Sequence, residues 1–122
     1  MALTTRKMSD AHEDWVVDLL GGRKSKNSGS QWHAQADGRQ SSYESAYAFS
    51  WDCKGTLAKS ASVSLAMWEK IRRQASPERP MVPLRFYANE KLDVLLDLVV
   101  VDAHDFAEIL ADANAYRKQV DG

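Results

Sequence analysis

Large side chains alternate with small or charged ones along residues 46–54. The large residues at every second position are Tyr47, Phe49, Trp51 and Cys53. Because side chains two residues apart lie on the same face of a β-strand, the alternation predicts a strand with one apolar face. The opposite face carries small residues and, where the strand ends, the charged pair Asp52 and Lys54.

A helix is expected near the start of the chain. Asp10 is placed to be its N-cap, with Glu13 three residues later completing a capping box. Val16 and Leu20 then fall on one apolar face, and Gly21-Gly22 is a typical helix stop. Glu13 therefore has two explanations, a capping role and a role in a functional site.

A second amphipathic helix is predicted over residues 62–75. Val63, Met67 and Ile71 recur at four-residue spacing, and charged side chains occupy the outer side. Pro77 follows this stretch and ends the helix.

Two strands and a final helix are expected after Pro77. The strands cover residues 81–88 and 92–101, and the second is predicted to be buried because its last four residues are apolar. Residues 102–118 form the last helix, with inward-facing Phe106, Ile109 and Leu110. The order, αβββαββα, predicts an α/β fold with a mixed central sheet flanked by helices.

Length and composition favour a single domain over residues 1–122. With 44% hydrophobic residues, the chain has enough apolar material for one core. No apolar run approaches the roughly 18 residues of a membrane span, and the first residues lack the apolar segment of a signal peptide. The single cysteine, Cys53, agrees with a reducing compartment and is expected to be a buried structural thiol. We therefore expect a cytoplasmic protein without a membrane segment.

Asp52 and Lys54 point to a specific chemistry. On a strand they project side by side, about 7 Å apart along the chain. A carboxylate can hold a hard divalent cation, and an adjacent ammonium can stabilise a hydroxide nucleophile or the charge that develops on a phosphate. A solvated cross-strand ion pair is the alternative explanation.

The order of acids along the chain resembles the PD-(D/E)XK nuclease superfamily, and within it the Holliday junction resolvase-like nucleases of archaeal and phage type. Glu13 resembles the acid of the first helix, and Asp37 takes the place of the first metal-binding Asp. Asp52-Cys53-Lys54 is similar to the (D/E)-x-K motif, and Ser28-Gly29-Ser30-Gln31-Trp32 to the glycine-serine loop that enters the first strand. Two departures are an Asp at position 52, where the resolvases usually carry Glu, and Gly38-Arg39 after Asp37 in place of hydrophobic residues.

The resemblance implies a restriction-endonuclease-like αβββαβ core, with an extra strand and helix at the C-terminal end. It also implies an active site in which Glu13, Asp37 and Asp52 bind Mg²⁺, or Mn²⁺ as a substitute. Lys54 would support the attacking hydroxide, and Gln74 would face the metal-bound water from the second helix; a solvated Gln74 is the alternative. Zinc is disfavoured because the chain has few His and Cys residues.

The net charge of −1 is distributed unevenly. Residues 1–18 carry 2 basic and 4 acidic groups, residues 19–91 carry 12 and 6, and residues 92–122 carry 2 and 7, which gives −2, +6 and −5. The basic middle segment is the expected DNA-binding surface, unless the clustering is chance. Its candidate phosphate contacts are Arg23, Lys24, Lys26, Ser28, Ser30, Lys59, Lys70 and Arg73. For the first three, an ordinary exposed turn is the alternative.

From the resemblance, the expected function is a Holliday junction resolvase that cuts four-way DNA junctions in phage or prokaryotic recombination. Two coordinated nicks require two sites, so a homodimer is expected, with Trp68, Phe106 and Leu110 as candidates for its contact. The alternatives are a general structure-selective or restriction-like nuclease and a non-catalytic DNA-binding protein that kept the fold.

Overall fold

The computed structural model of the chain describes residues 2–25, 36–41 and 46–121, and of residues 2–8 the backbone alone. It contains three helices and six strands within these ranges. In chain order the elements are α1 (Ala2–Leu20), β1 (Arg23–Lys24), β2 (Gly38–Arg39), β3 (Phe49–Trp51), β4 (Lys54–Thr56), α2 (Leu65–Ala75), β5 (Arg79–Tyr87), β6 (Val94–Val101) and α3 (Ala103–Asp121).

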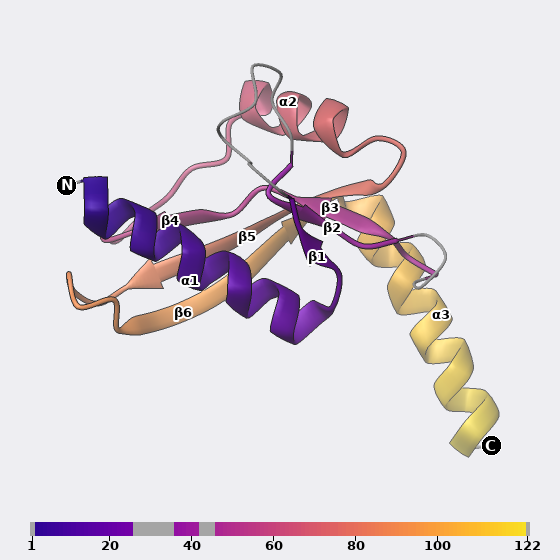
Figure 1. Cartoon of the computed structure of the whole chain (residues 1–122). Coiled ribbons are helices and arrows are strands. Elements are labelled where there is room, and N and C mark those ends of the chain that lie inside the picture. The colour runs from indigo at the N-terminus through magenta and orange to yellow at the C-terminus, as the bar shows by residue number, and fades with distance from the viewer. Residues whose placement is uncertain (1, 26–35, 42–45, 122) are drawn as a thin grey trace.

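The strands form one mixed sheet. β1 pairs with β2 and β2 with β3, both antiparallel. β3 and β4 then pair with β5 in parallel, and β6 pairs with the other edge of β5 in the antiparallel direction. The expected α/β class, a mixed open sheet flanked by helices, is therefore confirmed. Helices α1 and α2 lie on opposite faces of the sheet, and α3 extends away from it (Figure 1).

β3 and β4 are two parts of one strand with an irregular step at Asp52 and Cys53. Phe49 pairs with Arg79, and Lys54 pairs with Leu84, so both parts keep the same offset from β5. The strand expected over residues 46–54 thus has later bounds than the sequence pattern indicated, and the interruption falls at the charged pair.

The core lies between α1 and the sheet. Val16 of α1 packs with Phe49, Trp51 and Met81, and Trp51 is completely buried. Cys53 packs against the same cluster, as expected for a structural thiol, and burial raises its pKa. The opposite face of the sheet is covered by α2, which buries Ile71 and Ala75.

Two expected helix starts were wrong. α1 begins at Ala2, so Asp10 lies inside the helix and the capping box does not exist. α2 begins at Leu65, with Ser64 as its N-cap; the Ser64 hydroxyl accepts a hydrogen bond from the Met67 backbone N–H at 3.1 Å. The stop at Gly21-Gly22 is confirmed: both glycines have positive φ, 80° and 99°.

The expected burial of the C-terminal elements was also wrong. Leu98 and Val99 of β6 are 45% and 47% exposed, and Phe106 and Leu110 of α3 are exposed as well. Ile109 alone of the three expected inward residues packs against the core. Among the described residues, no element covers the outer side of β6, because the sheet ends there and α3 turns away from it (Figure 1).

Within the described ranges, no helix has both the length and the apolar character that crossing a membrane requires.

Candidate active site

The pairing of β2 with β3 brings Asp37 next to Asp52. Asp37 directly precedes β2 and Asp52 directly follows β3, and the antiparallel register places Gly38 opposite Trp51. The Asp37 backbone N–H donates to the Trp51 carbonyl oxygen at 2.8 Å. The Cys53 backbone N–H donates to Asp37 Oδ2 at 2.8 Å. Two acids 15 positions apart in the sequence are therefore held together by the backbone of the sheet.

Gly38 explains one departure from the family pattern. Gly38 and Arg39 form β2, which begins directly after Asp37. A Cβ at position 38 would lie 2.5 Å from Nε1 of Trp51, so only glycine lets the strand cross the buried indole ring. The glycine thus fixes the strand that positions Asp37.

The Asp37 carboxyl is the most strongly perturbed acid of the site. Burial raises its pKa to about 7, and a hydrogen bond to Asp52 and the charge of Asp52 act in the same direction. The Cys53 N–H, which favours the carboxylate, opposes them only in part. Asp37 therefore keeps its proton up to near neutral pH, because a second negative charge beside Asp52 is unfavourable.

Lys54 lies beside this pair. Its Nζ is 3.2 Å from Oδ2 of Asp52, which confirms the expectation that the two side chains share one side of the strand. The Lys54 side chain is 43% exposed and that of Asp52 is 24% exposed, so both can be reached from solvent. An ammonium group next to a carboxylate pair can stabilise negative charge on a molecule bound there.

Glu13 joins the same cluster from α1. Its side chain is buried in the middle of the helix, which excludes the capping role. Burial raises the pKa of Glu13, and the charge of Asp52 contributes, while Lys24 opposes the shift. Glu13 in turn raises the pKa of Asp37. Glu13 and Asp52 therefore lie close enough to Asp37 for their charges to raise its pKa.

The acids fit a hard divalent cation, although the described part of the chain contains no group of three His, Cys, Asp or Glu side chains already arranged around a single ion. Lys54 balances only one of the two carboxylates of Asp37 and Asp52, and a cation can take the place of the proton that Asp37 otherwise retains. Mg²⁺ retains several waters and is usually held by one or two carboxylates, so this pair suffices, with Glu13 nearby.

The remaining candidates fall into three groups. Lys26, Ser28 and Ser30 lie outside the described residues. Lys24 is in β1 and its Nζ is 3.0 Å from Oδ1 of Asp14, so a phosphate would compete with this carboxylate, and the DNA contact of Lys24 stays a prediction. Arg23 lies beside it in β1 and is exposed.

Four further candidates lie on or near α2. Lys70 and Arg73 are exposed on the outer side of the helix, as a phosphate-binding role requires. Gln74 is half-buried, and within the described ranges it makes no hydrogen bond to the three acids. Lys59 follows β4 and is exposed.

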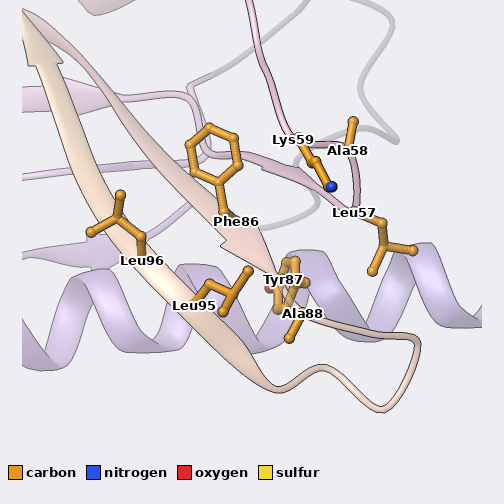
Figure 2. Close-up of a pocket in the computed structure, with 8 residues that line it drawn as sticks. All are labelled: Leu57, Ala58, Lys59, Phe86, Tyr87, Ala88, Leu95 and Leu96. Atoms are coloured by element: carbon orange, nitrogen blue, oxygen red, sulfur yellow. The ribbon is translucent and has the colours of Figure 1, made fainter.

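A separate hollow of about 490 Å³ lies at the far end of β4, β5 and β6. Its walls are mainly apolar, with Leu57, Phe86, Leu95 and Leu96 around it and Lys59 at one side (Figure 2). None of the acids lines it, so it is not part of the candidate active site.

Sequence reasoning missed Arg85. Its guanidinium donates to both carboxylate oxygens of Asp97, at 2.7 and 3.2 Å, and lies 4.8 Å from the Trp15 ring centre. Arg85 is 5% exposed and ties α1, β5 and β6 together beside the site. The available signal was a single cation within the largely apolar stretch of residues 80–87.

His12 precedes Glu13 in the sequence but takes no part in the cluster of acids. It is 1% exposed, and burial together with the charge of Arg85 lowers its pKa to about 4. The imidazole is therefore neutral at pH 7 and packs beside Trp15, at 6.5 Å between ring centres. It acts as a packing residue.

Comparisons with family models, with curated proteins and with solved structures find no match to this chain. The functional argument therefore depends on the residues of the site and their arrangement.

Proposed function

We propose that this protein is a divalent-metal-dependent DNA endonuclease of the PD-(D/E)XK type. The observation that carries the proposal is the placement of Asp37 beside Asp52 by the β2–β3 pairing, with the Cys53 N–H 2.8 Å from Asp37 Oδ2 and Lys54 Nζ 3.2 Å from Asp52 Oδ2. A structural ion pair needs one carboxylate for one ammonium, whereas here the half-buried Asp37 is a second acid beside Asp52 and raises the electrostatic cost of folding. Such a costly arrangement is typical of functional sites.

Each residue has a definite role in phosphodiester hydrolysis. Asp37 and Asp52 would hold the cation, assisted by Glu13, and the Cys53 N–H keeps the Asp37 carboxylate in place. Bound Mg²⁺ would supply Lewis-acid polarisation of the phosphate and a more acidic water. Lys54 stabilises the negative charge that accumulates on the attacking oxygen and on the phosphate.

The topology supports the finer fold assignment. An antiparallel meander of β1, β2 and β3 is followed by the helix α2, which crosses over to the parallel strand β5. This is the order and direction that a restriction-endonuclease-like core requires. The acids also occur where that core would have them, at the junction of β2 with β3 and on the helix that covers it.

We propose four-way junctions as the preferred DNA. The basic excess of residues 19–91, 12 basic against 6 acidic groups, provides a surface for phosphates, and α2 presents Lys70 and Arg73 to solvent. Cutting two opposed strands of a junction needs two sites, so the active form would be a homodimer.

A panel of DNA substrates tests the proposal. The protein is incubated with a synthetic four-way junction, a linear duplex of the same sequence and a single strand, each with Mg²⁺ or EDTA. Paired symmetric cuts in the junction, dependent on metal, are expected. Equal cutting of linear duplex would favour a general structure-selective or restriction-like nuclease, and metal-independent binding without any cutting would favour a non-catalytic DNA-binding protein.

A further inference from the structure

The apolar hollow at the end of β4, β5 and β6 adjoins the candidate active site along one face of the sheet. In the parallel ladder of β4 and β5, Lys54 pairs with Leu84 and Thr56 pairs with Phe86. Side chains two residues apart on a strand share one face, and so do side chains that are paired across a ladder. Phe86 therefore lies on the same face as Lys54, about 7 Å further along the strands.

The hollow has the size and the walls of a small-molecule site. Its volume is about 490 Å³, whereas ligand sites in proteins are usually of about 300–1,000 Å³ and mainly apolar. Among the described residues that line it, Lys59 is the only charged one, and it forms no ion pair with an acid of the described ranges. Apolar walls with an aromatic ring and one unpaired ammonium fit a flat apolar group that is joined to an anion.

Hydrogen bonds hold both walls of the hollow in place. On the β4 side, Thr56 Oγ1 accepts a hydrogen bond from the Ala58 backbone N–H at 3.0 Å, which fixes the turn that leads to Lys59. On the facing side, the Ala88 N–H donates to the Asp93 carbonyl oxygen at 2.7 Å and closes the turn between β5 and β6 (Figure 2). The hollow is therefore formed before a ligand binds, as ligand sites usually are.

The position of the hollow indicates which ligand of this kind it takes. With a DNA phosphate bound at Asp52 and Lys54, the neighbouring nucleotide of the same strand reaches the hollow, because one extended nucleotide spans the separation of about 7 Å. Its base can stack on the half-buried Phe86 ring, and its outer phosphate can contact Lys59. Cations next to an aromatic ring are the usual surface for unpaired nucleotides.

We propose that the hollow binds one unpaired nucleobase of the DNA strand whose phosphate lies at Lys54. Phe86 provides the stacking surface, and Lys59 contacts the phosphate beyond that base. This site rests on the proposed function and deepens it, because it makes an unpaired base part of the substrate. A base in a continuous duplex first has to leave its stack, so the hollow favours branched or bulged DNA over plain duplex.

Equilibrium binding of the full chain to three fluorescent duplexes tests the site. One duplex carries a single unpaired thymine, the second an abasic residue at the same place, and the third is fully paired. Binding is measured in Ca²⁺, an oxygen-binding cation with less strict geometry than Mg²⁺, and the DNA is checked to be intact afterwards. The wild type should bind the thymine bulge at least about tenfold more tightly than the abasic bulge, as expected for one stacked base.

Substitutions at Phe86 separate stacking from packing. Phe86→Leu keeps an apolar side chain and should reduce the affinity ratio of thymine to abasic bulge below about threefold, whereas Phe86→Trp should retain it, because base stacking needs an aromatic face. The matched control is Phe106→Leu, the same change on an exposed aromatic residue of α3, and it should leave the ratio unchanged.

Lys59→Ala should weaken the binding of both bulged duplexes alike. It should lower the slope of log K against log salt by about 0.7 to 0.9, as loss of one phosphate contact does. An unchanged slope would remove Lys59 from the site.

Equal affinity of the wild type for the two bulges, or equal ratios for Phe86→Leu and Phe106→Leu, would overturn the base site. Binding of anilinonaphthalene sulfonate that Phe86→Leu weakens but the thymine bulge does not displace would assign the hollow to another apolar anion and also overturn it. The nuclease fails separately: base discrimination without metal-dependent cutting in Mg²⁺ would refute the nuclease alone. Metal-dependent cutting with no base discrimination would refute the base site alone.

Discussion

Replacing Asp37 by asparagine should stabilise the metal-free protein while it removes metal binding. The side-chain oxygen of the introduced asparagine can still accept the Cys53 N–H, and its amide N–H can donate to Asp52 in place of the Asp37 proton. The variant therefore keeps both hydrogen bonds and loses the repulsion between two carboxylates.

The pKa of Asp37 gives the magnitude. A rise from 3.8 to about 7 corresponds to an upper limit of about 4 kcal/mol at about 1.4 kcal/mol per unit. The shift belongs to the pair rather than to one residue, and Asp37 is partly solvated, so we expect a gain of about 1 to 2 kcal/mol. That corresponds to a Tm increase of roughly 3–8 °C for a domain of this size.

The sign of the pH dependence follows from linkage. The pKa of Asp37 is higher in the folded state than in the unfolded state, so protonation of Asp37 favours folding. This contribution to stability is fully present below pH 3.8 and is lost as pH rises through about 7. The advantage of Asp37→Asn over the wild type should therefore be near zero at about pH 4 and complete at about pH 8.

Thermal melts of both proteins at these two pH values, in EDTA and in excess Mg²⁺ or Mn²⁺, measure these differences. At a hundredfold excess over Kd, metal should increase the free energy of unfolding of the wild type by about 2.7 kcal/mol, and its Tm should rise accordingly. Metal should have little effect on the Tm of Asp37→Asn. Glu90→Gln, an exposed loop acid, is the control and should behave as wild type. A lower Tm of Asp37→Asn at the higher pH in EDTA would refute the reasoning.

Three other substitutions test the structure around the site. Gly38→Ala should destabilise the fold by about 1–3 kcal/mol in urea unfolding, since its Cβ would overlap the Trp51 ring at 2.5 Å, and an unchanged midpoint would contradict the β2–β3 contact. Arg85→Met should cost about 1–3 kcal/mol in the same assay because it leaves the half-buried Asp97 carboxylate unpaired, and an unchanged midpoint would show that the ion pair is dispensable. Lys70→Ala/Arg73→Ala should lower the slope of log K for DNA against log salt by about 1.8, at about 0.9 per phosphate contact, and an unchanged slope would move the DNA surface off α2.

The Asp52–Lys54 part of the candidate site was accessible from sequence because it depends on a local pattern. Alternation over residues 46–54 placed Asp52 and Lys54 on one side of a strand, and this is confirmed by their 3.2 Å ion pair. The proximity of Asp37 to Asp52 followed from the resemblance rather than from spacing. Periodicity alone does not reveal it, because the antiparallel pairing of β2 with β3 is a long-range contact.

The errors concern properties that depend on neighbours. An apolar run such as residues 98–101 is compatible with burial in a sheet and with burial between two molecules, and one chain does not distinguish them. α1 began earlier than the capping signal at Asp10 because helix propagation does not require a cap at the first suitable residue. The Lys24–Asp14 ion pair joins β1 to α1. Sequence alone does not reveal that Lys24, a candidate phosphate contact, has this carboxylate partner, because the pair forms only in the tertiary structure.

The most direct test of the central claim is single-turnover junction cleavage by Asp52→Asn, with DNA binding measured in parallel. The substitution preserves shape but removes one of the two carboxylates that would hold the cation. We predict a cleavage rate at least about a hundredfold lower, with DNA affinity nearly unchanged and with Glu90→Gln as active as wild type. Cleavage by Asp52→Asn at the wild-type rate would contradict the assignment of this site.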